Sequence, residues 1–499
     1  TKSAPQGCGL GDDFKTSLDQ TASCLYTIRD MFIHRVAILL LALSLPAQAA
    51  TLHVSPEGTG SDGLTWQTGF PTIGEAIVAS STGDEVWVKS ATYVENVTIE
   101  QPLTLLGGFA GIEDRASERD WTSNVTVLKA SAFGPVIMIA GTSQCVVDGL
   151  HLTNGRWEEG AGISIRNSSV EVDNCAVFDN HTLSTGFYCS GGGIGVRDSS
   201  VKISRTFIYG NDGCLGGGGL VCIDAVVEIE NCKFFGNSAS SGGAVAIGES
   251  RVLIQGSTLE VNLARYDGAV ACSESNLIIR NTRIASNVAS ERTTSKIIEG
   301  GPIPPTTAFN SGAAIGASRS SVTVENCVLE NNRSQLDQGC YIGDSKTNAV
   351  FRNCTIVGSG SFPPALAWSA SASAPTLLNC ILVGPGILRY GQGYDDPEAE
   401  VSYSNLEGNY PGKGNINVDS KFVDSANGDY HLESDSPCIN SGTDTGLTTD
   451  FDGNPRPIGR YDMGAFEFPL FRSDLNGDGE VGPEDLMILQ SDWGKVSGP

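Results

Sequence analysis

The sequence predicts an all-β solenoid, a parallel β-helix in which short strands wind into stacked coils. Two columns of residues predict it. A hydrophobic residue closes a glycine-rich step at intervals of 31, 26, 25, 25 and 45 residues, and an asparagine follows each one by 17 positions. A repeat of this size is typical of solenoids, whose units bury their apolar faces against one another. The hydrophobic residues are Ile163, Ile194, Leu220, Val245, Val270 and Ile315, and the asparagines are Asn180, Asn211, Asn237, Asn262, Asn287 and Asn332.

The segments inside each unit have the composition of strands. Residues 170–173, 201–204 and 226–229 alternate, or nearly alternate, apolar and polar side chains. They are rich in β-branched residues, Gly, Asn, Asp and Ser bound them, and no helical period interrupts them. A unit of about 25 residues suits roughly three short strands and three turns, with neighbouring coils about 4.8 Å apart. The content of the unit therefore favours a β-helix over leucine-rich or helical repeats.

A further pair of columns predicts one bend of each coil. Small residues lie five positions before the repeat asparagines, and a polar residue or glycine precedes each of them. We expect the small side chains to fill the crowded interior, and asparagines at the bend to pair with the coils above and below. Gly149 and Asn154 place an earlier coil in the same register. The small residues are Cys175, Thr206, Cys232, Ser257, Thr282 and Cys327, continuing to Cys354 and Cys380; the bend residues are Asn174, Arg205, Asn231, Gly256, Asn281, Asn326, Asn353 and Asn379.

The first 49 residues have the pattern of an exported protein. Met31 is followed by His34 and Arg35, an apolar run over 36–45 and an Ala-Gln-Ala site over 47–49. This pattern predicts a secretory signal peptide at 31–49, and its apolar run is too short to serve as a transmembrane anchor. We therefore expect residues 1–30 to lie outside the mature protein and the mature chain to begin near Ala50, secreted or at a cell surface.

The charge of the chain excludes some partners. The first 49 residues hold four basic and four acidic side chains, so the remainder holds 27 against 53 and carries the whole formal net charge of −26. Binding to nucleic acid requires clustered Lys and Arg at phosphates, and nucleic acid is therefore not an expected partner. Divalent cations and neutral or basic partners suit such a chain better.

The cysteines divide into interior and loop positions. Twelve follow residue 49, in a compartment that permits disulfides. Those of the interior column are expected to act as small buried hydrophobic residues. Cys189 and Cys214 fall in the loops before successive glycine steps, one coil apart, and we predict a disulfide between them.

The flanking segments resemble known secreted proteins. Residues 50–130 include 62–66, 70–73, a helix-like stretch over 74–79 and the glycine-rich 107–111. They resemble the N-terminal cap and first coils of secreted bacterial β-helix proteins of the pectin-lyase-like superfamily, whose fold is a right-handed, single-stranded parallel β-helix. Physically, a cap protects the open edge of the first coil. The resemblance implies that coils occupy residues 131–435.

Two further resemblances concern the repeats and the C-terminal end. The glycine steps Gly242-Gly243-Ala244-Val245 and Gly312-Ala313-Ala314-Ile315 resemble the repeats of polymorphic outer-membrane proteins over about 160–345, although no autotransporter barrel follows. Residues 436–440, 450–456 and 462–467, together with the preceding 429–432, resemble the end of choice-of-anchor Q β-helix proteins. This resemblance implies a closing segment at 436–470 and says little about chemistry.

The last segment, 471–499, predicts a calcium site. Oxygen ligands lie at positions 1, 3, 5 and 12 of a loop, glycine at position 6 permits a sharp turn, and the position-7 carbonyl completes the set. The loop and the helix after it resemble an EF-hand and one half of a type I dockerin. A dockerin pairs two such loops and only one is visible, which argues against a cohesin partner but not against calcium. The predicted ligands are Asp474, Asn476, Asp478, the Glu480 carbonyl and Asp485.

Catalytic residues are not identifiable in the sequence. Polygalacturonase-like signatures are absent, and His53, His151 and His431 lie in strand-like segments. The insertion at 288–310 is either a binding loop or a simple excursion. A column four residues after the glycine-step residues is either an exposed turn or a cation- or sugar-binding ladder. It consists of Asn167, Asp198, Asp224, Glu249, Glu274 and Arg319.

Two functions follow from these observations. The first is a non-catalytic protein of the bacterial cell surface or medium, used for adhesion or for binding polysaccharide or other surface glycans, with a calcium-binding tail. The second is a polysaccharide lyase or glycoside hydrolase that carries a dockerin-like module. The sequence favours the first because it shows no catalytic constellation.

Overall fold

The computed structural model describes most of the chain after the N-terminal segment. The described residues are 49–183, 190–290, 312–334, 340–342, 346–358, 366–369, 374–384, 387–390, 398–469 and 482–492. All but Ala49 belong to one compact unit, Ala50–Pro499. The predicted signal peptide lies outside the described residues.

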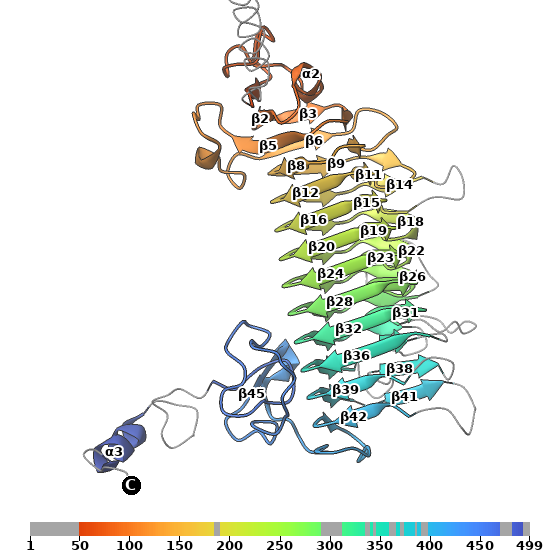
Figure 1. Ribbon diagram of the computed structural model, residues 1–499, viewed down its shortest axis with the longest axis vertical. Coiled ribbons are helices and arrows are strands. Elements are labelled where there is room, and N and C mark those ends of the chain that lie inside the picture. Colours follow the sequence, from red (N-terminus) through yellow and green to blue (C-terminus); the bar gives the residue numbers. More distant parts are fainter. Residues whose placement is uncertain are drawn as a thin grey trace, which may run out of the picture. The chain divides into compact units, whose positions relative to one another are not determined.

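The chain winds into a parallel β-helix whose coils stack in register (Figure 1). Each complete coil contributes a strand in turn to four sheets, which we call sheets C, A, B and D. Ile163 pairs with Ile137 of the coil before and with Ile194 of the coil after, and Val170 pairs with Val201. The glycine-step residues predicted to align, Ile194, Leu220, Val245, Val270 and Ile315, do pair in succession. The predicted solenoid is confirmed.

Sheets A and B run along most of the described coils. Sheet A consists of β1 (Thr51–Val54), β2 (Glu85–Lys89), β5 (Leu103–Phe109), β8 (Cys145–Asp148), β12 (Ser169–Asp173), β16 (Ser200–Ser204), β20 (Val226–Glu230), β24 (Arg251–Gln255), β28 (Asn276–Arg280), β32 (Ser321–Glu325), β36 (Asn348–Arg352), β39 (Thr376–Leu378) and β42 (Glu400–Ser402). Sheet B consists of β3 (Thr92–Val94), β6 (Thr126–Lys129), β9 (Leu150–Thr153), β13 (Ala176–Phe178), β17 (Phe207–Tyr209), β21 (Lys233–Phe235), β25 (Thr258–Glu260), β29 (Arg283–Ala285), β33 (Val328–Glu330), β37 (Thr355–Val357), β40 (Ile381–Val383) and β43 (Asn405–Leu406).

Sheets C and D complete the coils. Sheet C consists of β4 (Val97–Ile99), β7 (Ile137–Ala140), β11 (Ile163–Arg166), β15 (Ile194–Arg197), β19 (Leu220–Ile223), β23 (Val245–Gly248), β27 (Val270–Ser273), β31 (Ile315–Ser318), β35 (Cys340–Ile342), β38 (Leu366–Ser369) and β41 (Ile387–Tyr390). Sheet D consists of β10 (Arg156–Trp157), β14 (His181–Thr182), β18 (Asp212–Gly216), β22 (Ser238–Ser241), β26 (Leu263–Tyr266), β30 (Val288–Ala289) and β34 (Arg333–Ser334).

Left-handed residues make the turns between the sheets. The predicted bend residues Asn231, Asn326, Asn353 and Asn379 all have φ between 49° and 54° and join sheet A to sheet B. Each is followed by a buried cysteine, so this prediction is confirmed. The column that contains Asp198 and Glu249 has the same backbone and joins sheet C to sheet A. Asn and Asp tolerate this conformation better than most side chains, which explains their recurrence.

Buried asparagines form a ladder between sheets B and D. The Asn237 Nδ2 donates to Asn262 Oδ1 at 3.0 Å and to the Ile208 carbonyl at 2.8 Å. The Asn237 Oδ1 in turn accepts from the backbone N–H of Asn211 at 3.1 Å. The same pattern connects the repeat asparagines from Asn180 to Asn332, all of which are buried. Each amide thus satisfies backbone groups that the turn would otherwise leave unpaired inside the protein.

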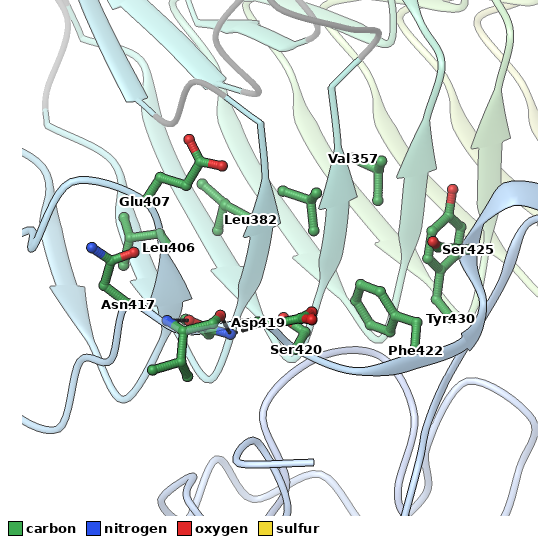
Figure 2. A pocket seen from close by; sticks show the side chains of 13 residues that line it. Val357, Leu382, Leu406, Glu407, Asn417, Asp419, Ser420, Phe422, Ser425 and Tyr430 are labelled. Carbon is green, nitrogen blue, oxygen red and sulfur yellow. Dashed lines mark hydrogen bonds between the residues drawn. The ribbon is translucent and has the colours of Figure 1, made fainter.

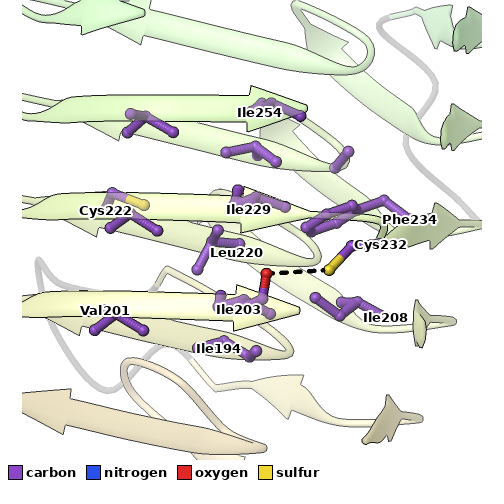
Figure 3. Packing of buried hydrophobic residues seen from close by; sticks show 14 of the residues in the cluster. Ile194, Val201, Ile203, Ile208, Leu220, Cys222, Ile229, Cys232, Phe234 and Ile254 are labelled. Carbon is purple, nitrogen blue, oxygen red and sulfur yellow. Dashed lines mark hydrogen bonds between the residues drawn. The ribbon is translucent and has the colours of Figure 1, made fainter. Parts of the chain in front are cut away.

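The interior between the sheets is apolar and continuous along the coils. Ile203, Ile229 and Ile254 stack in successive coils, and Phe234 fills the corner beside them (Figure 3). The Cys232 Sγ lies 3.4 Å from the Ile203 carbonyl oxygen, and burial raises the pKa of this thiol to about 12. The interior cysteines Cys175, Cys232, Cys327, Cys354 and Cys380 are unbonded and buried, as expected of small hydrophobic residues.

A short helix and an aromatic cluster belong to the first coils. The helix α2 (Ile73–Ala79) confirms the helix-like stretch, and the Thr72 side chain caps its N-terminus. Trp87 stacks on Phe109 with ring centroids 4.8 Å apart. A 3₁₀ turn, η1 (Ala116–Glu118), lies in the loop that follows β5. The helix α2 packs against β1, β2 and β4, and a capping role for residues 50–130 stays a prediction.

The chain returns along the coils after β43, and we call residues 407–469 the strap. It contains β44 (Phe422–Asp424), the 3₁₀ turn η3 (Ser425–Asn427) and β45 (Asp429–Leu432), which pairs with β44 antiparallel. The strap binds the A–B bend column: Asn326 Nδ2 donates to the Thr449 carbonyl at 2.7 Å and Asn379 Nδ2 to the Thr443 carbonyl at 2.7 Å. The helix α3 (Pro483–Asp492) is the last described element.

The bend asparagines therefore have two kinds of partner. Asn174 pairs with neighbouring coils as expected, because its Nδ2 donates to Asp148 and its Oδ1 accepts from Arg205. In the last coils the corresponding Asn326, Asn353 and Asn379 bind the strap instead. The strap supplies backbone carbonyls at these turns, so the amides turn outward toward it.

Candidate functional site

The outer face of sheet B carries exposed aromatic side chains at aligned positions. Phe178 pairs with Tyr209, and Tyr209 pairs with Phe235, so the three rings follow one row along consecutive coils. Phe207 occupies the neighbouring outward row of the same sheet. We call Phe178, Phe207, Tyr209 and Phe235 the aromatic lane. The Phe178 and Tyr209 rings are stacked, with centroids 5.0 Å apart and planes 2° from parallel.

The lane is open to solvent although its residues are strongly hydrophobic. Phe207, Tyr209 and Phe235 are 56%, 36% and 42% exposed. The alternation of each strand directs Ile208 and Phe234 into the core and leaves their neighbours outside. The next strands place Thr258, Glu260 and Arg283 at the same outward positions, so the fold does not require aromatic residues there. A contiguous exposed apolar patch is typical of an interaction surface.

Polar and charged groups frame the lane. The Lys233 ammonium lies 5.5 Å from the Phe235 ring centroid and 3.3 Å from the Glu260 carboxylate. His151 lies edge-on to Phe178, with ring centroids 6.3 Å apart. Burial lowers the pKa of His151, which keeps the imidazole neutral near pH 7. Asp212 accepts a hydrogen bond from the Ser238 hydroxyl at 3.0 Å, on the adjoining strands of sheet D.

The strap covers the same face of sheet B in later coils. The Tyr430 hydroxyl donates to Glu330 Oε2 at 2.6 Å, and Glu330 also forms an ion pair with Arg283. Tyr430 and Phe466 pack with Val328 in one buried cluster. The strap therefore buries the sheet B surface from about β29 onward and leaves the surface of β13 to β21 open.

A pocket of about 530 Å³ lies between the strap and the last strands of sheet B. Val357, Leu382 and Leu406 line it from the sheet, and Phe422 and Tyr430 line it from the strap (Figure 2). Glu407, Asn417, Asp419 and Ser425 are polar residues of the same lining (Figure 2). The pocket continues the outer face of sheet B at the C-terminal end of the coils.

The predicted calcium loop lies mostly outside the described residues. Asp474, Asn476, Asp478 and Glu480 fall in the segment 470–481. Asp485 is described: it is buried, lies in the first turn of α3, and its Oδ2 accepts the Gly482 N–H at 2.7 Å. No cluster of three His, Cys, Asp or Glu side chains suited to a metal ion occurs among the described residues. The calcium site and the cohesin partner stay predictions.

Three further predictions from the sequence concern the acidic turn column, the Cys189–Cys214 disulfide and the 288–310 insertion. The column with Asp198, Asp224, Glu249 and Glu274 is exposed at the C–A turns, where its left-handed backbone accounts for its composition. Arg319 forms an ion pair with Glu274 there. Cys214 is disulfide-bonded, and Cys189 lies outside the described residues, so their pairing stays a prediction. Most of the 288–310 insertion, from residue 291 onward, also lies outside them.

His431 has stronger partners than its strand context indicates. Its ring nitrogens lie 2.6 Å from Asp429 and 2.7 Å from Asp452, and its ring packs on Phe466. Burial alone would lower the pKa of His431, but the bonds to Asp452 and Asp429 outweigh it and raise the pKa. These contacts lie within the strap and hold its two halves together.

The aromatic lane was missed by the sequence analysis, although its signal is readable. Phe178, Tyr209 and Phe235 each stand two positions before a ladder asparagine. A left-handed residue, Asp179, Gly210 or Gly236, separates each aromatic residue from its asparagine, so strand alternation ends there and the aromatic residue can point outward while the asparagine points inward. Aromatic residues recurring at an outward position indicate a surface function.

Comparison with known proteins agrees on the fold. Residues 135–356 match the family described as right handed beta helix region. The chain contains a right-handed β-helix. Its solved structural relatives include XylC in complex with xylose (TM-score 0.48, 9% identity, covering 84% of this chain and 98% of that one) and pectate lyase Pel9A (TM-score 0.46, 12% identity, 84% and 97%). An alginate lyase from Paenibacillus sp. str. FPU-7 is also similar (TM-score 0.37, 13% identity, 66% and 94%).

No curated protein matches by sequence, and no helix among the described residues is long and apolar enough to cross a membrane.

Proposed function

We propose that this protein is a secreted or cell-surface β-helix that binds a polysaccharide along the aromatic lane. The observation that carries the proposal is the row of Phe178, Tyr209 and Phe235, aligned on successive coils, in which Phe178 is half-buried and Tyr209 and Phe235 are exposed. A sugar ring presents an apolar C–H face that stacks on an aromatic ring, and its hydroxyl edge then meets polar groups at the side. The Phe178 and Tyr209 rings stack on each other 5.0 Å apart, the spacing of neighbouring coils, so a sugar chain that follows the lane would meet their outer edges and pack on the exposed Phe207 and Phe235.

The charge of the chain favours a neutral polymer. The formal net charge is −26. Beside the lane, Asp179 acts on Tyr209, Asp212 lies on the adjoining strand of sheet D, and Glu260 pairs with Lys233. A polyuronate would be repelled by this surface, whereas a neutral polysaccharide would not. A protein–protein interface normally has a larger apolar core than this narrow row of side chains provides, so the lane does not suit a protein partner.

Binding to a panel of soluble polysaccharides tests the proposal. Affinity electrophoresis would compare xylan, β-glucan and mannan with polygalacturonate and alginate. The triple variant Phe178→Ala, Tyr209→Ala, Phe235→Ala should weaken binding to a neutral polymer by at least about tenfold, since stacked aromatic residues dominate such contacts. Phe133→Ala is the matched control, because Phe133 is 54% exposed but lies outside sheet B.

The outcomes separate the two functions that the sequence left open. Equal binding by the triple variant and the parent protein would overturn the proposal that the aromatic lane binds polysaccharide. Product chains released from the same polymers, measured as new reducing ends, would show an enzyme in place of a binding protein. The calcium-binding tail belongs to the proposal as its second element, and the full chain should be assayed with and without calcium.

A further inference from the structure

One coil departs from the glycine pattern of the solenoid at Asp267. The residue three positions before the glycine-step hydrophobe is left-handed in five successive coils, and in the first four it is Gly160, Gly191, Gly217 or Gly242, with φ between 63° and 72°. In the next coil the position is Asp267, with φ of 52°. Glycine adopts this conformation without steric cost, whereas a residue with a Cβ is held there at a cost.

The following coil is adjusted to accept this side chain. Gly316 lies on β31, paired with Ala271 of β27. A Cβ on Gly316 would lie 1.8 Å from the Asp267 Oδ1, closer than two non-bonded atoms can approach. The carboxylate thus occupies the space that a side chain takes on the neighbouring strands. Gly195 in the same row also lacks a Cβ, but its neighbour is the Gly160 backbone, whereas at Gly316 the Asp267 carboxylate fills the space, so these two residues fit one another.

The carboxylate lines a groove on the outer face of sheet C. The groove has a volume of about 400 Å³, with Val221, Ala246, Ala271 and Gly316 in its floor. Ser241 donates to Asp267 Oδ2 at 3.3 Å from the wall. Leu215, 50% exposed, also lines the groove and precedes Gly216, which pairs with Ser241 in sheet D. Among the described residues that line the groove, Asp267 is the one charged side chain.

The surroundings of Asp267 weaken its ionisation. Burial raises its pKa to about 7, although hydrogen bonds from the Gly312 N–H and Ser241 favour the charged form. The Cys272 thiol, in the core beneath the groove, is the other titratable group nearby, and burial raises its pKa to about 11, so it stays neutral. A carboxylate that lacks sufficient partners in a small apolar groove gains stability from a ligand that donates hydrogen bonds.

We propose that the sheet C groove is a second ligand site, in which Asp267 recognises a sugar unit through hydroxyl or amine donors. The small side chains of the floor admit the apolar face of a sugar ring close to the sheet. Asp267 then accepts hydrogen bonds from two donors on the ring edge, which suits both neutral sugars and amino sugars. The groove lies on a different sheet from the aromatic lane, so the two sites are independent.

Calorimetric titration of the full chain at pH 7 tests the site with two probes, cellobiose and the glucosamine disaccharide. Hydroxyl donors favour the ionised carboxylate, so binding of cellobiose, which has no group that titrates near pH 7, should release protons. Titration in two buffers of different ionisation enthalpy measures this release. Salt should weaken binding of the amino sugar and leave the neutral sugar unchanged, which distinguishes the two sources of donors.

Variants at Asp267 decide whether the carboxylate binds the ligand. Asp267→Asn should weaken binding at least about tenfold and abolish proton release. Asp267→Gly restores the residue of the other coils, so it should fold with an unreduced melting temperature and lose binding equally. Asp198→Asn is the matched control, an exposed left-handed aspartate outside the groove.

Two results would overturn the proposal. The first is the absence of saturable heat with either disaccharide at millimolar concentrations. The second is binding and proton release by Asp267→Asn equal to those of the parent protein. The triple variant of the aromatic lane should retain groove binding, which separates failure of this site from failure of the lane.

Discussion

At the scale of single residues, the turns of this protein depend on which asparagines are buried. Asn237 and Asn231 are six residues apart in one coil, yet Asn237 is fully buried in the ladder and Asn231 is exposed at a left-handed turn. The first satisfies backbone groups of its neighbours, whereas the second serves mainly by tolerating its φ. The same residue type therefore contributes to stability in two different ways.

Replacing Asn237 should destabilise the protein strongly. Asn237→Ala leaves the Ile208 carbonyl and the Asn211 N–H buried without their side-chain partner, which should cost about 2–4 kcal/mol of unfolding free energy. Asn231→Gly keeps the left-handed turn and should change the unfolding free energy by less than about 1 kcal/mol. Denaturant unfolding of both variants measures the difference. An equal loss of unfolding free energy in both would show that the asparagine ladder stabilises the protein no more than the turn residue does.

At the scale of elements, the sequence predicted where strands and turns lie better than it predicted which side chains contact one another. The period located strands, turns and interior columns because a solenoid converts chain spacing directly into spatial register. It could not reveal that Asn326, Asn353 and Asn379 bind the strap, since those contacts join residues 64 to 123 positions apart. The Asp267 and Gly316 pair was hidden for the same reason: an insertion separates two positions that touch in space.

An ion pair within the strap is fully buried, and its arginine also binds Asn326 of the coils. Arg456 donates to Glu467 at 2.6 Å and to Asn326 at 2.7 Å, and both charged side chains are inaccessible to solvent. Asp462 lies in the same region, and burial together with repulsion by Glu467 raises its pKa to about 7. Arg456 is thus the cation that stabilises a cluster of acids between the strap and the coils.

Removing this cation should release the strap before the coils unfold. Arg456→Leu leaves Glu467 buried without its partner, a change that typically costs about 3–5 kcal/mol. Limited proteolysis should then cut within residues 407–469 and spare the coils up to β43. Arg460→Leu is the control, because Arg460 is exposed in the same segment. Cleavage of the Arg456→Leu variant at the same rate as the parent would contradict the assigned role.

At the scale of the whole molecule, the rigid coils separate surfaces that a smaller fold would merge. Sheet B presents the aromatic lane, the strap and the pocket in sequence along its outer face, and sheet C presents the Asp267 groove. Stability in such a stack sums over neighbouring coils, so outward positions are free to vary without loss of the core. This freedom explains why the fold was readable from the sequence while the surfaces were not.

Calcium should act on the predicted loop and not on the acidic turns of the solenoid. The net charge of −26 offers carboxylates in both places. The turn carboxylates of Asp198, Asp224 and Glu249 sit in separate coils as exposed side chains, whereas Asp474, Asn476, Asp478 and Asp485 follow the ligand spacing of one loop. A single loop is expected to bind weakly, with a dissociation constant of about 10⁻⁴–10⁻³ M. Calorimetric calcium titration of the full chain should show one saturable site that Asp474→Ala removes and Asp198→Asn preserves. Loss of binding in Asp198→Asn would place the cation on the solenoid, and binding unchanged by Asp474→Ala would remove the loop site.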